Sequence, residues 1–439
     1  MLTFLGLIAP IFFIVVGLEY LIGKMMGKEI YHFSDAITNM TAGMAERLFD
    51  FFYAIIMLFV FKWVFDNFAI TELPRTPLMW FLCMLVYDFL YYWYHRTGHE
   101  ANFLWAVHIV HHQSENYNLT VGSRQSGFQA IARTAFLSVL PILGFVPEFA
   151  WTVFIVGGTH QFFLHTQLIG KLGFLEYIFV TPSSHRVHHG RNDQYLDKNY
   201  GGIFIWWDMI FGTYQKEEDT VRYGITTGLP SNNIYWAYFH YWADLFKQAK
   251  TIKGFSNKLK LFVKRPGWTP EGMQRPAEDK NNTLDRPLYD PKAPLSLAIY
   301  VLLQVVLGMS LLSAMLIKKG KVTDGYDSLM SFYTEFMPLG EVLTYTVLIT
   351  MATLTVPVLI EKKKWAYQVE HVRLALMAIG VPFILMGLEI GDPVGSLFAG
   401  VFLAFSVWLY RMRHNFTGKG DKDSRSNSRL ETVRSFLFK

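Results

Sequence analysis

The run LAIYVLLQVVLGMSLLSAMLI, residues 297–317, decides the class of fold, because its 21 residues contain no charged side chain. A helix needs about 20 apolar residues to cross the hydrocarbon core of a bilayer. Two further uncharged runs lie at residues 342–360 and 394–410, and a shorter one at residues 374–388 contains Pro382. These runs predict an all-α polytopic membrane protein.

The composition agrees with this class. The chain has 439 residues, of which 52% are hydrophobic, 17% aromatic and 17% charged, whereas soluble domains are about 25% charged. Disordered and collagen-like chains are excluded. Because Cys83 is the only cysteine, an intramolecular disulfide framework and a cysteine-rich zinc site are excluded as well. We expect no nucleic-acid partner.

The apolar runs of the N-terminal half are less pure than those of the C-terminal half. They cover residues 4–23, 51–68, 78–94 and 134–156, and they contain Glu19, Lys62, Asp66, Asp88, Pro141, Pro147 and Glu148. A charge inside a membrane span is costly and usually faces a bundle interior or a functional site. We therefore expect plain membrane helices in the C-terminal half and the walls of a functional site in the N-terminal half.

The pattern predicts four parts. These are N-terminal transmembrane helices (1–77), a catalytic domain with a surface-associated segment (78–293), a C-terminal transmembrane bundle (294–411) and a basic tail (412–439). Residues 4–23 lack the flanks of a cleaved signal peptide and are interpreted as a retained span. The positive-inside rule places the tail and the Lys318–Lys321 cluster in the cytoplasm. Both can be cytoplasmic only if an even number of spans lies between them. Three apolar runs follow residue 341, so the two placements conflict unless one run does not cross the membrane.

A basic stretch lies in the span-free segment 180–293. Between residues 247 and 265 it contains seven Lys or Arg, interleaved with apolar residues such as Phe246, Leu259 and Val263. This pattern is typical of an amphipathic helix on an anionic membrane surface, and also of a solvated helix face. The proline-rich segment 275–294 is predicted to be a linker to the C-terminal spans.

Histidines are concentrated in two short windows, residues 95–112 and 185–189. Of the 14 histidines in the chain, these windows hold eight: His95, His99, His108, His111, His112, His185, His188 and His189. The first two are spaced i,i+4, and the other two sets are each spaced i,i+3,i+4. On a helix each set would lie on one face and aim at one point.

Imidazole suits iron, zinc and copper, and eight histidines are too many for one metal but suitable for two. His165, at the end of a predicted helix, is a candidate ninth ligand. Asp88 lies two helical turns before His95 and is a natural carboxylate partner for its second N–H group. The other histidines are interpreted as structural, namely His32, His160, His240, His371 and His414. A proton relay remains an alternative for the clusters, but it does not need the repeated spacing.

These sets resemble the three histidine boxes of the fatty acid hydroxylase and sterol desaturase superfamily. The similarity extends to Thr181-Pro-Ser-Ser-His185 and to Asn199-Tyr200-Gly201, which leads into Trp207–Thr213. Within the superfamily, the chain most resembles the branch that cleaves alkylglycerol ethers. Supporting features are His99-Glu100, Glu115–Leu119, Arg124-Gln125-Ser126, Pro266-Gly267-Trp268 and the extra C-terminal spans.

The resemblance implies a di-iron membrane monooxygenase with a histidine-box catalytic cap on the cytoplasmic face, and it makes the eight box histidines iron ligands. It also implies tetrahydrobiopterin as a cofactor, with Glu100 at the pterin. The implied reaction uses molecular oxygen to hydroxylate the carbon next to the ether oxygen, which yields a fatty aldehyde and a glycerol derivative. The implied location is the endoplasmic reticulum in a eukaryote and the inner membrane in a bacterium.

Three alternatives remain open from the sequence. The first is a hydroxylase or desaturase of sterols or fatty acids that receives electrons from a cytochrome or ferredoxin. The chain itself carries no G-x-G-x-x-G fingerprint or haem module. The second is a transporter or metal-binding membrane protein without catalysis, and the third is a pair of structural zinc sites, which could not activate oxygen.

Overall fold

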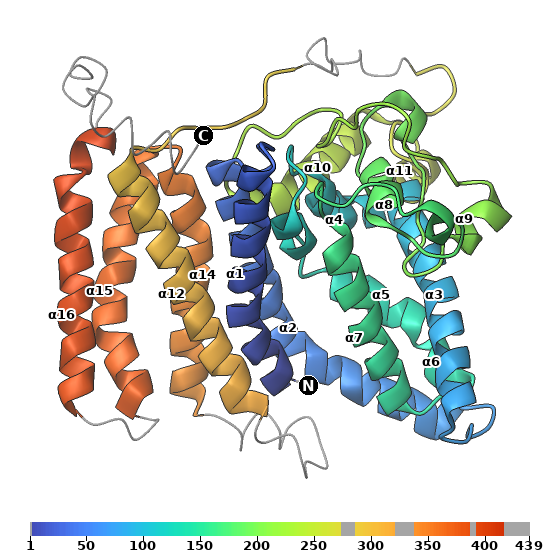
Figure 1. Cartoon of the computed structure of the whole chain (residues 1–439), viewed down its shortest axis with the longest axis horizontal. Helices are drawn as coiled ribbons and strands as arrows, with labels where there is room; N and C mark the ends of the chain where they lie inside the picture. The colour runs from blue at the N-terminus through green and yellow to red at the C-terminus, as the bar shows by residue number, and fades with distance from the viewer. Residues whose placement is uncertain (1, 274–285, 321–337, 387–391, 417–439) are drawn as a thin grey trace. The chain divides into compact units, whose positions relative to one another are not determined.

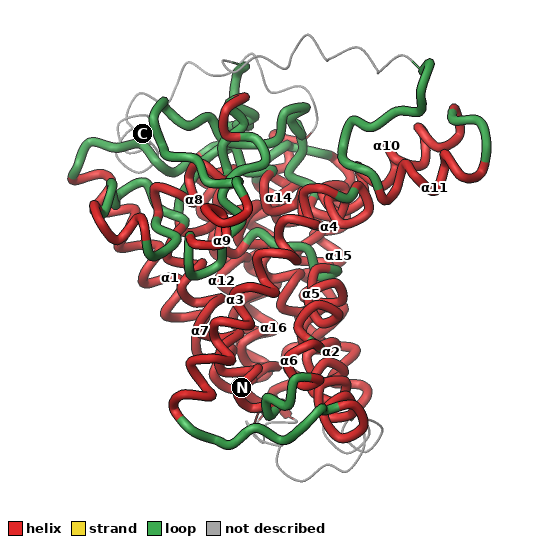
Figure 2. The backbone as a smooth tube through the Cα atoms, turned by 90° about the vertical axis from the view of Figure 1, so that its right-hand side faces the viewer, coloured by secondary structure: helices red, strands yellow, loops and turns green. Residues whose placement is uncertain are grey.

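The computed structural model describes residues 2–273, 286–320, 338–386 and 392–416. Within these ranges the chain forms helices joined by loops and contains no strand, as Figure 2 shows. Two isolated β-bridges, Phe179 with Phe204 and Gly190 with Tyr223, are the only extended pairings in the described part. The predicted all-α class is confirmed.

The chain forms two compact units. The bundle unit consists of Met1–Phe51, Ser231–Tyr235 and Asp290–Lys439, and the histidine unit consists of Phe52–Pro230 and Trp236–Tyr289. The long helix α2 (Phe33–Phe68) contributes to both units.

Long apolar helices make up the bundle unit. They are α1 (Leu2–Met25), the first part of α2, α12 (Leu295–Gly320), α14 (Leu339–Leu359), α15 (Lys364–Met386) and α16 (Asp392–Arg411), followed by the short η4 (Arg413–Phe416). Figure 1 shows α12, α14, α15 and α16 running side by side. Four described helices are long and apolar enough to span a bilayer, or five if the two halves of α2 count as one broken span. The protein is a multi-pass membrane protein.

One C-terminal span differs from the prediction. The third candidate span covers Lys364–Leu385, so it begins before Leu374 and includes Glu370 and Arg373. Both side chains are fully buried and pair at 2.6 Å. The Glu370 carboxylate also accepts hydrogen bonds from Tyr300 and Thr355, each at 2.6 Å. The expectation of plain C-terminal helices is therefore wrong for α15, because a matched ion pair makes two charges tolerable inside the bundle.

The helix count also corrects the predicted topology. Three described helices, α14, α15 and α16, separate the Lys318 end of α12 from Arg411, so these two basic positions lie at opposite ends of the bundle (Figure 1). They cannot both be cytoplasmic. The Lys318 ammonium pairs with the buried Glu341 carboxylate. Because its charge is neutralised, Lys318 does not count among the exposed positive charges that set the orientation of the chain in the membrane. Lys321 and residues 417–439 of the tail lie outside the described residues.

The histidine unit contains shorter helices and more loop. In chain order these are α3 (Pro77–Glu100), α4 (Asn102–His112), η1 (Leu119–Ser123), α5 (Gln129–Leu137), α6 (Val139–Ile142), α7 (Pro147–Leu164), η2 (Gly173–Tyr177), α8 (Pro182–His188), η3 (Asp193–Tyr195), α9 (Trp206–Phe211), α10 (Ile234–Thr251) and α11 (Phe255–Val263). Thr76 caps α3 by accepting a hydrogen bond from the Met79 amide at 3.3 Å, and Pro77 occupies the first turn, where its missing N–H costs nothing.

The predicted span at residues 134–156 is wrong. This stretch breaks into the end of α5, then α6 and the start of α7. Gly144 makes the break with a φ of +95°, and a Cβ at this position would lie 2.0 Å from the Thr71 carbonyl oxygen. Pro147 then begins α7. A left-handed residue followed by proline ends one helix and starts another.

Candidate metal centre

The first two histidine boxes lie on α3 and α4, two helices that are separated by a single residue. His95 and His99 lie in the last turns of α3, and Ala101 then adopts an extended conformation before α4 begins at Asn102. The Asn102 side chain donates to the Leu261 carbonyl at 2.7 Å. This contact fixes the start of α4, so that its histidines face those of α3.

All nine histidines proposed as ligands come together in two buried groups. Each residue offers one ligand atom, and within a group these atoms lie within 4.8 Å of one another. The five-histidine group consists of His95, His99, His108, His112 and His188. The four-histidine group consists of His111, His165, His185 and His189.

The second and third boxes each divide between the two groups, which corrects the expectation that each box aims at one point. In α4, His108 and His112 belong to the five-histidine group, while His111 belongs to the other. The third box does the reverse, because His185 and His189 belong to the four-histidine group and His188 does not. Residues i and i+4 lie almost in line along a helix, whereas i+3 lies to one side.

Backbone carbonyls fix the orientation of several imidazoles. The Nδ1–H groups of His95, His111 and His188 donate to the carbonyl oxygens of Tyr200, Arg124 and Lys198 at 2.9, 3.0 and 2.9 Å. His165 Nδ1–H donates to the Gln161 carbonyl at 2.8 Å. Each contact leaves the Nε2 lone pair directed into the group, which is the usual arrangement of a metal-bound histidine.

The inward nitrogens face one another. His108 Nε2 lies 3.1 Å from the Nε2 atoms of both His95 and His112. In the other group, His165 Nε2 lies 3.2 Å from the Nε2 atoms of His111, His185 and His189. The buried Nε2 atoms of His99 and His188 have no hydrogen-bond partner in the described part of the chain. Buried polar atoms without partners are costly, and a cation about 2 Å from each nitrogen would satisfy them.

Burial lowers the pKa of eight of the nine imidazoles, which favours their neutral form. It lowers the pKa of His95 to about 3 and that of His165 to about 4. Burial also holds the pKa values of other box histidines well below the ordinary value of an imidazole. His108 and His189 are two examples. A neutral imidazole keeps the lone pair that a metal needs.

Comparison with known proteins agrees with this chemistry. The fatty acid hydroxylase family model matches residues 80–213, which include all nine histidines. An alkylglycerol monooxygenase of Danio rerio is 39% identical over 315 residues, which cover 70% of this chain and 70% of the relative. The chain belongs to the alkylglycerol monooxygenase family.

Two further members of this family are similarly close. The alkylglycerol monooxygenase of Homo sapiens is 38% identical over 264 residues, covering 60% of this chain and 59% of the relative. That of Xenopus tropicalis is 37% identical over 301 residues, covering 67% of each chain. No solved structure matches the chain at a significant level.

The sequence predicted that Asp88 would accept a hydrogen bond from His95, and this prediction is wrong. The second nitrogen of His95 donates to the Tyr200 carbonyl instead. The Asp88 carboxylate instead accepts hydrogen bonds from the amides of Ile203 and Phe204 at 2.6 and 2.9 Å and from the Trp207 indole at 3.0 Å. It therefore holds the turn that follows Tyr200 and acts on His95 through that segment.

Asp208 holds the same segment from the other side. Its carboxylate accepts from the amides of Tyr200 and Gly201 at 2.7 and 2.8 Å and from the Thr213 hydroxyl at 2.6 Å. Burial raises the pKa of Asp208 to about 6. Asp208 lies in the Trp207–Thr213 motif, but its contacts with Tyr200 and Gly201 form only when the loop folds, so the sequence alone did not indicate this role.

Glu100 lies at the end of α3, outside both histidine groups. Its carboxylate accepts hydrogen bonds from Arg96 Nε at 3.0 Å and from Arg265 Nη2 at 2.6 Å. The side chain is 24% exposed, so Glu100 remains accessible from outside the group that contains His99.

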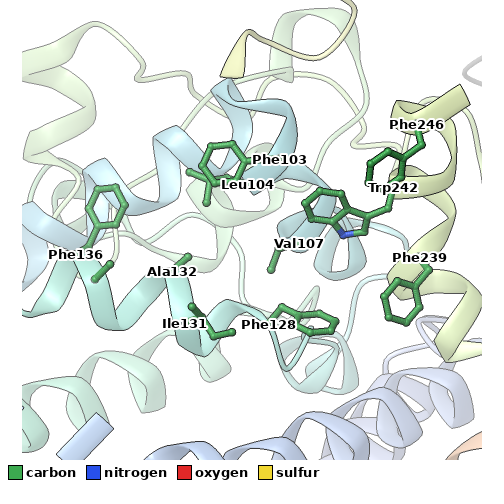
Figure 3. Close-up of a pocket in the computed structure, with 11 residues that line it drawn as sticks. Phe103, Leu104, Val107, Phe128, Ile131, Ala132, Phe136, Phe239, Trp242 and Phe246 are labelled. Carbon is green, nitrogen blue, oxygen red and sulfur yellow. The ribbon is translucent and has the colours of Figure 1, made fainter. Parts of the chain in front are cut away.

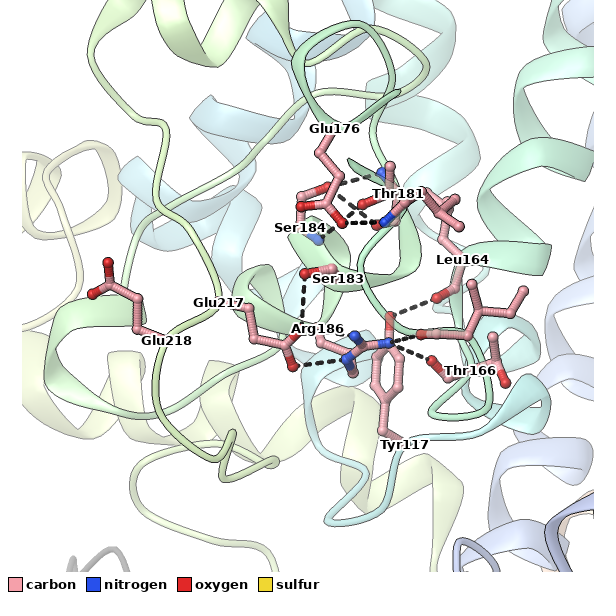
Figure 4. Close-up of polar contacts among 12 residues, drawn as sticks. Tyr117, Leu164, Thr166, Glu176, Thr181, Ser183, Ser184, Arg186, Glu217 and Glu218 are labelled. Atoms are coloured by element: carbon pink, nitrogen blue, oxygen red, sulfur yellow. Dashed lines mark hydrogen bonds and ion pairs between the residues drawn. The ribbon is translucent and has the colours of Figure 1, made fainter. Parts of the chain in front are cut away.

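An arginine clamp fixes the third box, and the sequence analysis did not identify it (Figure 4). Arg186 donates to both carboxylate oxygens of Glu217, at 2.8 and 2.7 Å. It also donates to the carbonyl oxygens of Thr166 and Ile169, at 3.0 and 2.8 Å. Ser183 donates to Glu217 at 2.8 Å. The clamp therefore joins α8, which carries His185, to the loop that follows His165.

Proposed function

We propose that the protein is a membrane monooxygenase that hydroxylates the carbon next to the ether oxygen of alkylglycerol lipids. The resulting hemiacetal collapses to a fatty aldehyde and a glycerol derivative. One oxygen atom of O₂ enters the C–H bond and the other leaves as water, which takes two electrons and two protons from a reductant. The observation that carries the proposal is the pair of buried histidine groups in a chain of this family.

The two groups would hold two iron ions. The five-histidine and four-histidine sets supply only imidazole nitrogen, a ligand that suits iron, copper and zinc. Iron changes its oxidation state and can supply the one-electron chemistry that oxygen activation requires, whereas zinc cannot. The backbone carbonyls that accept from the Nδ1–H groups of His95, His111 and His188 leave the Nε2 atoms of these three imidazoles free to bind the ions.

Tetrahydrobiopterin is the proposed reductant. Glu100 is the proposed pterin contact, supported by its place beside His99 in sequence and by its partial exposure. The two arginines on its carboxylate hold it in place, and a carboxylate can accept hydrogen bonds from ring N–H groups. Asp88 supports the site through the 203–207 turn.

The substrate reaches this site from a membrane. We propose the endoplasmic reticulum as the location in a eukaryotic cell and the inner membrane in a bacterial cell. The functional division at residues 78–293 and 294–411 also remains a proposal, with Met1–Phe51 in the same compact unit as Asp290–Lys439.

The test is turnover by purified protein loaded with iron. Alkylglycerol, oxygen and reduced pterin should yield fatty aldehyde, measured by mass spectrometry. Parallel reactions replace the pterin with a reduced cytochrome or ferredoxin chain and the alkylglycerol with a sterol or a fatty acid. Aldehyde formation with pterin alone supports the proposal. Alkylglycerol left intact under all three electron donors, with two irons bound, would refute it.

A further inference from the structure

An open apolar groove of about 600 Å³ lies in the histidine unit between α4, α5 and α10. Figure 3 shows side chains from the three helices converging on it. Phe103 and Leu104 come from α4, Ile131 from α5, and Phe239 and Phe246 from α10. Its wall contains none of the box histidines, although α4 supplies both groove residues and metal ligands.

The groove suits a hydrocarbon chain. Its lining consists of Phe, Leu, Val, Ile and Ala with one tryptophan, so the Trp242 indole N–H is the only polar side-chain group among the lining residues. A peptide in such a groove would leave backbone groups without hydrogen bonds, which costs free energy, whereas an alkyl tail needs none.

Helix α10 joins the groove to positive charge. Phe239, Trp242 and Phe246 are spaced i,i+3,i+7 and line the groove, and Lys250 continues the same row one turn later. Lys247 lies three residues before Lys250 and Lys253 three residues after it, and all three lysines are exposed. From residue 234 to residue 268 there are seven Lys or Arg and one acid, Asp244.

Helix α11 extends the apolar surface outward. Leu245, Ile252 and Leu261 pack inward against Ala106, whereas Phe255, Leu259 and Val263 are 76%, 52% and 58% exposed. These three are spaced i,i+4,i+8 along α11. Phe262 of the same helix meets Phe246 with ring centroids 5.7 Å apart, so α11 contacts a residue that lines the groove. An exposed apolar row among lysines is typical of a helix at an anionic lipid surface.

We propose that this groove binds the tail of an anionic phospholipid from the surrounding membrane, with the lipid phosphate held by Lys247, Lys250 and Lys253. The tail accounts for the apolar lining, and the phosphate accounts for lysines at the end of the aromatic row. The inference goes beyond the proposed reaction and does not depend on it.

Photo-crosslinking of the purified full-length chain tests the groove. The probes are phosphatidylglycerol and phosphatidylcholine that carry a diazirine at the end of one tail, and peptide mass spectrometry locates the label. We expect phosphatidylglycerol to label peptides of α5 and α10. Ala132→Trp or Ala135→Trp should reduce that labelling about ten-fold, because an indole would fill the groove. Labelling around Leu403, which is 67% exposed on α16, should not change and serves as the internal control.

A charge series tests the headgroup. Replacing Lys247, Lys250 and Lys253 by Gln should reduce phosphatidylglycerol labelling about ten-fold and phosphatidylcholine labelling much less, because the choline of phosphatidylcholine cancels the charge of its phosphate and each lysine favours a lipid with net negative charge. The matched control replaces Lys362, Lys363 and Lys364 by Gln and should have no effect. Equal labelling by the two lipids would overturn the assignment of an anionic headgroup to the three lysines, and labelling that persists in both Trp variants would overturn the groove assignment. Because the readout is labelling, an inactive enzyme would not affect either result.

Discussion

Each of the two units buries a cluster of polar side chains, and the two clusters are built in opposite ways. In the bundle unit, the Glu370 carboxylate meets only donors, namely Arg373, Tyr300 and Thr355. In the histidine unit, nitrogens face nitrogens at 3.1 to 3.2 Å. In the bundle cluster each acceptor has a donor, so its polar atoms are satisfied without a ligand and the hydrogen bonds hold the helices together. Imidazole nitrogens that converge on one point can share a cation, so the second arrangement indicates a metal site and the first does not.

Removing a histidine should have the largest effect. Replacing any one of the eight box histidines by Ala should abolish turnover and reduce iron from two ions per chain to one or none, because each removes a ligand from a group of four or five. Elemental analysis and aldehyde formation measure the two effects. A variant that keeps full activity would remove that histidine from the ligand set. His240→Ala, outside both groups, is the matched control.

Breaking the other cluster should affect stability and leave the metal in place. Glu370→Leu isolates Arg373 in the bundle and should lower the free energy of unfolding by about 3–5 kcal/mol. The double change Glu370→Leu with Arg373→Met should recover most of that loss, since no buried charge remains. Thermal unfolding in detergent measures the effect. Iron loss at an unchanged unfolding temperature would show that the bundle cluster serves the metal site.

The arginine clamp should have an intermediate effect. Glu217→Gln removes the charge that holds the Arg186 guanidinium in place and should therefore loosen the contacts of Arg186 with the loop after His165. Iron affinity should fall about 10–100-fold, as for other residues that orient metal ligands. Glu218→Gln is the matched control, because Figure 4 shows the neighbouring Glu218 pointing away from the clamp. Equal effects of the two changes would mean that Arg186 is held by other contacts.

The smallest effect is expected at Glu100, whose carboxylate lies outside both clusters. Glu100→Gln should raise the KM for pterin about ten-fold through the loss of one charge-assisted hydrogen bond, while iron content stays at two ions per chain. Steady-state kinetics with varied pterin measures it. If iron is lost instead, Glu100 supports the metal ligands and does not bind the pterin.

The sequence was sufficient for the parts of the site that follow helical spacing. Uncharged runs located α12, α14 and α16, and the i,i+3,i+4 sets located the box histidines. Spacing could not show how the second and third boxes divide, because His111 and His112 are neighbours on one turn and only the position of the facing helix decides which group each joins.

Contacts between distant segments were not predictable from a single sequence. Arg186 and Glu217 are 31 residues apart, with no periodic pattern between them. Charge also hid the start of α15, since Glu370 and Arg373 were excluded from the apolar run that they belong to. Their i,i+3 spacing was the available signal, because opposite charges at that spacing can neutralise each other on one helix face.

The division of the histidine boxes has a consequence for how the protein acquires its metal. Helix α4 supplies ligands to both groups, and so does the segment formed by α8 and the following His189. The first ion to bind therefore fixes the helices that the second ion needs. The ordering entropy is then lost once for two ions, so uptake should be positively cooperative. A preparation with half its iron should consist mainly of fully loaded and empty molecules, with few that carry a single ion.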